Sequence, residues 1–250
     1  MLAKKAYERP ARLVPSDLDP LRALAGDGAL DYLLVIAAFH FVNRIADLLD
    51  VDPEAIPERL RRFESLRRLA VRLASLWMAK MDLASRVYPL TYEEALTKFG
   101  PLCERATGRP TGDAFAPLRS RPKLIEAVLL ALEERDARSS LDRQTLARVH
   151  GAVEAALPAS IDDIEGLHPR PSDPVEAFAF VGTRYAYRAS ADMIDALRRR
   201  GYDDLRILDL AIAIADANQW ARLHRLAGLA PDLYYLSASE DTREPAPAVA

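Results

Sequence analysis

The residues best suited to chemistry lie on two long apolar segments of the chain. In the first, His40 is followed by Asn43 and Asp47, a spacing that places all three on one side of a helix. An imidazole oriented by a neighbouring amide or carboxylate can accept and donate protons near neutral pH. The apolar surroundings favour a simpler interpretation, a core histidine whose ring nitrogens bond to neighbours on its own helix.

The second segment carries Asp216, Asn218 and His224, with Trp220 between them. Asp216 stands among apolar residues, and burial of its charge requires a cationic partner, for which Arg222 or an arginine of another helix is suitable. We expect a hydrogen-bond network that ties helices together. A polar site shared by both segments is the alternative, and it makes these residues and the His40 group weak catalytic candidates.

Other reactive side chains favour structural roles. His150 and Glu154, four residues apart, could supply two metal ligands, but no third ligand is evident and a solvent-facing pair is expected. Cys103, the only cysteine, is expected to fill a partly buried apolar site, with mild activation beside Arg105 as the alternative. No glycine-rich phosphate loop or nucleophile motif occurs. We therefore predict neither a metal nor a cofactor.

Composition limits the classes of function. The chain has 250 residues, half of them apolar, and a formal net charge of -3 with acidic and basic residues interspersed. This balance offers no field that attracts nucleic acid or an anionic membrane. The N-terminal residues lack the apolar run of a secretory signal, and the longest apolar stretch, 33–42, is about half of the roughly 20 residues that span a bilayer. We predict a cytoplasmic protein that binds neither nucleic acid nor a membrane.

An all-α fold must position these residues. Alanine, leucine and arginine dominate, and no segment shows the alternation of a strand. The expected helices are 17–25, 29–50, 64–84, 92–107, 121–137, 141–157, 173–188, 191–200 and 204–228. The expected caps are Ser16 or Asp17, the pair Thr91 and Glu94, Ser140 and Asp173 at N-termini, and Gly201 and Gly228 at C-termini. Helix 64–84 has one apolar and one arginine-rich side, so docking of a partner protein there is a further hypothesis.

The two long apolar segments also match each other. When 28–54 is placed over 206–232 without gaps, Asp31 meets Asp209 and Arg44 meets Arg222. A short charged helix precedes each copy and a proline follows it, which favours an internal repeat. We predict an N-terminal helical half at 1–112, a C-terminal helical half at 113–236 and a disordered tail at 237–250.

The sequence AFHFVNRIADLLDV at 38–51 resembles the closing long helix of carboxymuconolactone decarboxylase-like proteins, the superfamily that includes alkylhydroperoxidase D. Members carry a phrase close to FNFxNRxADxLGV after a short helix of the type DVxALRxAGxxDxEI. A similar lead-in, ADMIDALRRRGYDDL, stands at 191–205. The resemblance covers 16–53 and 173–230, and it implies helical packing like that of alkylhydroperoxidase D.

The resemblance also shows what is missing. Peroxidase chemistry in this superfamily uses Cys-x-x-Cys at a helix start, where one thiolate attacks the peroxide and the other resolves the sulfenic acid. The helix expected at 141–157 has no cysteine and Cys103 has no partner thiol, so disulfide-based peroxide reduction is excluded. The decarboxylase branch acts on a lactone acid through acid/base groups, without a disulfide.

We therefore expect a degenerate member of the superfamily, a non-catalytic or regulatory helical protein that forms a homo-oligomer. The alternative is a non-thiol enzyme that uses acid/base groups on a small organic acid. A small-molecule ligand is compatible with both.

Overall fold

The computed structural model describes residues 2–49, 91–97, 115–122, 124–125, 139–158 and 171–230. Within these residues the chain is mostly helical and contains no strand, which confirms the predicted all-α class. The expected helix 64–84, Cys103 and the tail 237–250 lie outside this part of the chain. The two halves, the internal repeat and the packing like that of alkylhydroperoxidase D stay predictions.

The helices are α1 (Leu2–Glu8), α2 (Asp19–Ala25), α3 (Ala29–Leu48), α9 (Arg143–Ala156), α10 (Pro174–Arg184), α11 (Ala191–Arg199) and α12 (Asp204–Ala227). Short 3-10 turns occur at Pro10–Arg12, Pro15–Leu18, Gly26–Gly28, Ala116–Leu118 and Ala186–Arg188, and residues 92–97 are also helical. The expected helices that fall on α2, α3, α9, α11 and α12 are confirmed to within two residues. Helix α1 has no counterpart among them, because seven residues are too few to show an apolar period.

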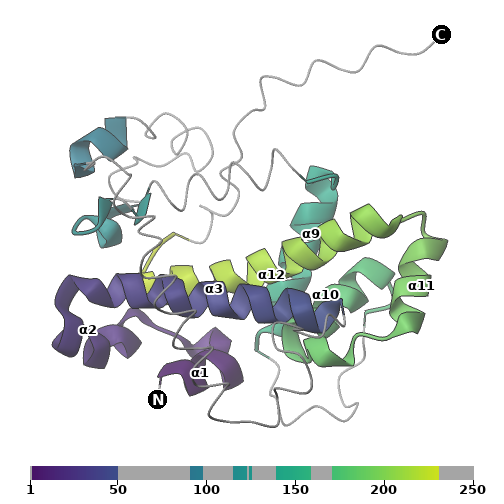
Figure 1. Cartoon of the computed structure of the whole chain (residues 1–250), viewed down its shortest axis with the longest axis horizontal. Coiled ribbons are helices and arrows are strands. Elements are labelled where there is room, and N and C mark those ends of the chain that lie inside the picture. The colour runs from purple at the N-terminus through teal and green to yellow at the C-terminus, as the bar shows by residue number, and fades with distance from the viewer. Residues whose placement is uncertain are drawn as a thin grey trace, which may run out of the picture.

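Helix α12 lies at the centre of the described structure, with α3 along it (Figure 1). It also packs against α9 and α10. The alanines at 211, 213, 215 and 217 are at most 2% exposed, and such small side chains let helices approach on several sides. Leu30 near the start of α3 lies beside Leu223 and Ala227 near the end of α12, so the two long helices run antiparallel.

Hydrogen bonds at the helix ends confirm most of the expected caps. Asp173 accepts hydrogen bonds from the backbone N–H groups of Val175 and Glu176 at the start of α10. Gly228 ends α12 in the left-handed conformation with φ of 75°, where a side chain would be strained. Thr91 and Glu94 form the expected reciprocal pair, at 2.8 and 3.2 Å. Gly201, which follows α11, also has a positive φ.

Two of the expected caps are wrong. Asp142 caps α9 by accepting from the Thr145 N–H, whereas the N–H of Ser140 donates to Asp209 on α12. Asp17 accepts from the Val14 N–H and from the Lys5 ammonium at 2.7 Å, so it joins the turn to α1 and does not cap α2. The Ser140 hydrogen bond uses the backbone N–H, whereas the Asp17 carboxylate is occupied by Lys5 and Val14.

The helical stretch Pro15–Leu48 is long and apolar enough, by length and composition, to cross a membrane, although only 29% of its most apolar window is buried. A core helix of a soluble protein and a signal sequence both meet this criterion. The apolar stretch 33–42 is shorter than this helical stretch, because Asp31 and Tyr32 precede it and Asn43 follows it. The absence of a membrane partner therefore stays a prediction.

Two glycines provide a direct test of the packing around α12. A Cβ on Gly182 of α10 would lie 2.9 Å from Ile214 and 3.0 Å from Leu48, which belong to α12 and α3. We expect Gly182→Ala to destabilise the protein by about 1–3 kcal/mol, because these branched side chains have no room to move. The measurement is the free energy of unfolding in urea.

Gly151 on the exposed side of α9 is the matched control, since no atom lies within 4 Å of the position that a Cβ would take there. Gly151→Ala is expected to stabilise the chain by roughly 0.5–1 kcal/mol through its helix propensity. Equal effects of the two substitutions would contradict the close approach of α10 to α3 and α12.

Candidate functional site

A pocket of about 180 Å³ lies where α1, the second half of α3 and the end of α10 come together. Its lining is mainly polar: Tyr7, His40, Asn43, Arg44, Asp47, Thr183, Arg184, Tyr185, Ala186 and Tyr187. Helix α3 contributes one face of four residues, and the end of α10 with its following turn contributes five consecutive residues. The site is therefore built by segments that are distant in sequence.

The structure brings the first predicted group together. His40, Asn43 and Asp47 all line this pocket, as their helical spacing requires. His40 is half-buried, whereas Asn43 and Asp47 are exposed. A cavity therefore adjoins the imidazole, and its surroundings are not those of a closed core.

Arg44 also lines the pocket, and like Tyr7 and residues 183–187 it is not among the candidates predicted from the sequence. It is 8% exposed, and one of its terminal nitrogens donates to the backbone carbonyls of Gly182 and Thr183, the latter at 2.9 Å. These carbonyls belong to the last turn of α10, where no intrahelical donor remains and the helix dipole is negative. The signal was present in the alignment of Arg44 with Arg222, which placed an arginine at the same point of both long helices.

Two further buried arginines make the same kind of contact. Arg222 donates from Nε to the Ala6 carbonyl in the last turn of α1 at 3.0 Å. Arg184 donates to the carbonyl of Leu157, which caps the end of α9, at 3.4 Å. Arg222 is 2% and Arg184 is 7% exposed. Three helix C-termini thus converge on three buried guanidinium groups.

The arginines are close enough to repel one another. Burial, followed by the charges of Arg44, Arg184 and Arg225, holds the pKa of Arg222 well below its usual value. Burial and Arg184 lower the pKa of Arg44 to about 10, against the opposite influence of Asp47 and Tyr7. Among the described residues, Nε of Arg44 has no hydrogen-bond partner. The positive charge beside the pocket is therefore incompletely compensated there.

The same cluster keeps His40 neutral. Burial, Arg222 and Arg44 together lower the pKa of His40 to about 4. At neutral pH its imidazole carries one proton and offers one free lone pair as a hydrogen-bond acceptor. The ring is thus suited to accept a hydrogen bond from a molecule in the pocket.

The second predicted group does not line this pocket. Asn218 is fully buried, and its amide donates to Thr183 Oγ1 at 3.0 Å and to the Ile214 carbonyl at 2.9 Å. Arg222 in turn donates to the Asn218 carbonyl at 2.7 Å. The expected structural network is confirmed for Asn218, and it supports the pocket through Thr183. Asp216, on the same helix, is half-buried and also has an interaction partner.

His224 belongs to a different cluster, and the expected solvent-facing pair of His150 and Glu154 is wrong. His150 and His224 are only 8% and 7% exposed. Glu154 binds Arg225 through both carboxylate oxygens, at 3.2 and 2.6 Å, and lies 3.9 Å from the His224 ring. Burial alone would raise the pKa of Glu154, but hydrogen bonds from His224 and Arg225 lower it to about 2.

This cluster joins α9 to α12, because Glu154 of α9 contacts His224 and Arg225 of α12. His224 also packs on the ring of Trp220, with 6.1 Å between the ring centroids. Over the described ranges, no three histidine, cysteine or acidic side chains are grouped so that they could hold a metal ion. The two hydrogen bonds between Glu154 and Arg225 and the packing of His224 on Trp220 support a structural role for the cluster.

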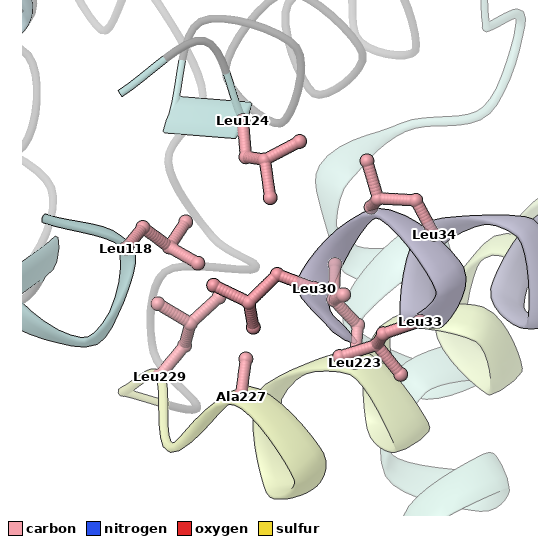
Figure 2. A pocket seen from close by; sticks show the side chains of 8 residues that line it. All are labelled: Leu30, Leu33, Leu34, Leu118, Leu124, Leu223, Ala227 and Leu229. Atoms are coloured by element: carbon pink, nitrogen blue, oxygen red, sulfur yellow. The ribbon is translucent and has the colours of Figure 1, made fainter. Parts of the chain in front are cut away.

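A second cavity, shown in Figure 2, is unsuited to chemistry. Its lining is entirely apolar: Leu30, Leu33, Leu34, Leu118, Leu124, Leu223, Ala227 and Leu229. Its volume of about 10 Å³ corresponds to a single water molecule, which would find no polar partner there. We interpret it as a packing gap between α3, α12 and the segment around Leu118.

Comparison with known proteins identifies no relative of this chain. No family model, no curated protein and no solved structure matches the chain. The superfamily resemblance at 38–51 consequently stays a prediction. The pocket residues are therefore the basis on which a function can be proposed.

The depressed pKa of His40 predicts an acid-dependent loss of stability. Because the folded-state pKa is about 4 and the unfolded value is 6.5, protons bind the unfolded chain more tightly between these values. Stability should therefore be complete above about pH 6.5 and fall as the pH drops toward 4. For a half-buried ring we expect a loss on the order of 1–2 kcal/mol between pH 7 and 5.

The measurement is urea unfolding of the wild type and His40→Asn at both pH values, with the His40 ring signal titrated by NMR. The variant should lose that part of the acid dependence. An NMR midpoint near 6.5 would contradict the assignment of a neutral imidazole beside the arginine cluster.

Proposed function

We propose that this chain binds a small organic acid in the pocket between α1, α3 and the end of α10, without thiol chemistry. The observation that carries the proposal is Arg44, a buried guanidinium that lines a polar cavity and repels its arginine neighbours. A carboxylate bound there would compensate positive charge that the described residues leave unbalanced. Guanidinium groups bind carboxylates more strongly than neutral acceptors.

His40 offers the same ligand a second contact, because it lines the same pocket. A neutral imidazole can accept a hydrogen bond from a hydroxyl or amine of the ligand, so it adds specificity without adding charge.

The size of the pocket limits the ligand. Cavities that hold drug-sized molecules measure roughly 300–1,000 Å³, whereas this one measures about 180 Å³. A molecule with one acid group and a small body fits this volume.

We test the proposal by thermal unfolding in sodium acetate and sodium chloride at equal ionic strength, with acetamide as the uncharged analogue. Acetate should raise the unfolding temperature, and acetamide should not, because only the anion neutralises the arginine cluster. A ligand at 100 times its dissociation constant stabilises a protein by about 2.7 kcal/mol. Chloride, a smaller monovalent anion that can enter the same site, should raise the midpoint less than acetate does. Equal midpoints in acetate and acetamide, up to the solubility limit, would contradict the proposal.

Asp47 provides a variant that leaves the core intact. Its carboxylate is exposed, lines the pocket and competes with an anion for the field of Arg44. Asp47→Asn should tighten acetate binding about two- to fivefold, the range of an exposed charge interaction. Asp195→Asn, on the surface of α11, is the matched control and should leave acetate binding unchanged.

Self-association is a second candidate, and the observation that favours it is an exposed apolar row on α3. Tyr32, Val35 and Val42 are 56%, 63% and 61% exposed. Their spacing of three and seven residues is that of a seam between two paired helices. We propose that a second copy of the chain packs on this row through the same surface, as two-fold symmetric dimers do.

The test is light scattering after gel filtration at micromolar concentration. The wild type should have the mass of an oligomer, and the pair Val35→Glu and Val42→Glu should shift it to the monomer mass, because two charges would be buried in the seam. Leu205→Glu, at another exposed apolar position, is the control. A monomeric wild type would contradict this second proposal and leave the first untouched.

A further inference from the structure

We infer that the ligand is a planar aromatic acid, whose ring lies against Tyr7 and Tyr187 while its carboxylate faces Arg44. This inference rests on the proposed binding of an organic acid and adds the body of the molecule to its acid group. It follows from the arrangement of tyrosines around the pocket.

Tyrosines are concentrated at this site. The whole chain has nine, and Tyr7, Tyr185 and Tyr187 all line the one pocket. Tyr185 is 6% exposed and stands edge-on to Phe180, with 6.2 Å between ring centroids. It is therefore held in place by the core and forms a buried part of the wall.

The other two rings are open to solvent. Tyr7 is 53% and Tyr187 is 58% exposed, although both line the cavity. The guanidinium of Arg188 lies 5.9 Å from the centroid of Tyr187 and occupies one side of that ring. Exposed aromatic surface at the mouth of a polar pocket is suited to stacking with a planar ligand, which removes that surface from water.

The position of Tyr7 relates the ring to the acid group. Tyr7 and Arg44 line the same pocket, so an aromatic side chain adjoins the cavity that contains the proposed carboxylate contact. Arg222 fixes this position, because it binds the carbonyl of Ala6, the residue before Tyr7, at 3.0 Å. In a cavity of about 180 Å³, a carboxylate attached directly to its ring fits better than one at the end of a long flexible chain.

The neutral His40 provides a further contact for the aromatic ligand. It lines the same pocket as the two open rings, and it can accept a hydrogen bond from a ring hydroxyl. A hydroxyl-bearing aryl carboxylate would thus use Arg44, the tyrosines and His40 together. No covalent step is required for this recognition.

The experiment compares three probes by isothermal titration calorimetry at pH 7, where all are anions: acetate, benzoate and cyclohexanecarboxylate. The last has nearly the size of benzoate and a more apolar but non-planar body. We expect benzoate to bind about three- to tenfold more tightly than cyclohexanecarboxylate, as stacking on an aromatic side chain allows. Equal or weaker binding of benzoate would overturn the inference.

Three matched variants locate the effect. Tyr7→Leu and Tyr187→Leu keep apolar bulk without a ring, and each should abolish the preference for benzoate while acetate binding is retained. Tyr32→Leu, an equally exposed tyrosine on the far part of α3, should leave the preference unchanged. A preference that survives in both pocket variants would also overturn the inference.

The outcomes separate this inference from the proposal beneath it. If acetate binds and benzoate shows no preference, the organic-acid site stands and its aromatic character is rejected. If no carboxylate binds at millimolar concentration, the proposed function fails and the inference fails with it.

Discussion

The described structure depends on one interaction, the hydrogen bonds from buried arginines to the carbonyl ends of helices. Arg44, Arg184 and Arg222 reach the C-termini of α10, α9 and α1 respectively. Each carbonyl would otherwise lack a donor, and a hydrogen bond to a charged group is worth roughly 1.5–3 kcal/mol. The interaction fixes how three helices end against the central α12, and in doing so it gathers three positive charges in one interior region.

The pocket is a consequence of this gathering. Helix dipoles supply only partial negative charge, so they offset the guanidinium groups of Arg44 and Arg222 incompletely. Burial and, after it, the neighbouring arginines lower the pKa values of Arg44 and of His40, and both residues line the cavity. The same contacts that hold α1 and α10 in place also deliver Tyr7 and the residues after Thr183 to the pocket wall. Structural support and ligand recognition therefore use the same side chains.

Much of this arrangement could be predicted from the sequence, and the reasons for the rest are physical. Helical periodicity placed α3 and α12 correctly and grouped His40, Asn43 and Asp47, because all three lie on one helix. The contribution of α1 and of residues 183–187 depended on tertiary contacts over more than one hundred residues. The pairing of Glu154 likewise depends on Arg225, on another helix, which the spacing within α9 cannot show.

The most direct test of the account is anomalous diffraction from crystals of the protein grown or soaked in sodium bromide. Bromide carries one negative charge and scatters strongly enough to be located without assumptions about a ligand. We predict a bromide peak inside the pocket, within contact distance of the Arg44 guanidinium and near His40. Bromide at surface sites only, with the Arg44 side chain paired to a carboxylate of the protein itself, would contradict the claim that buried positive charge is left open to the pocket.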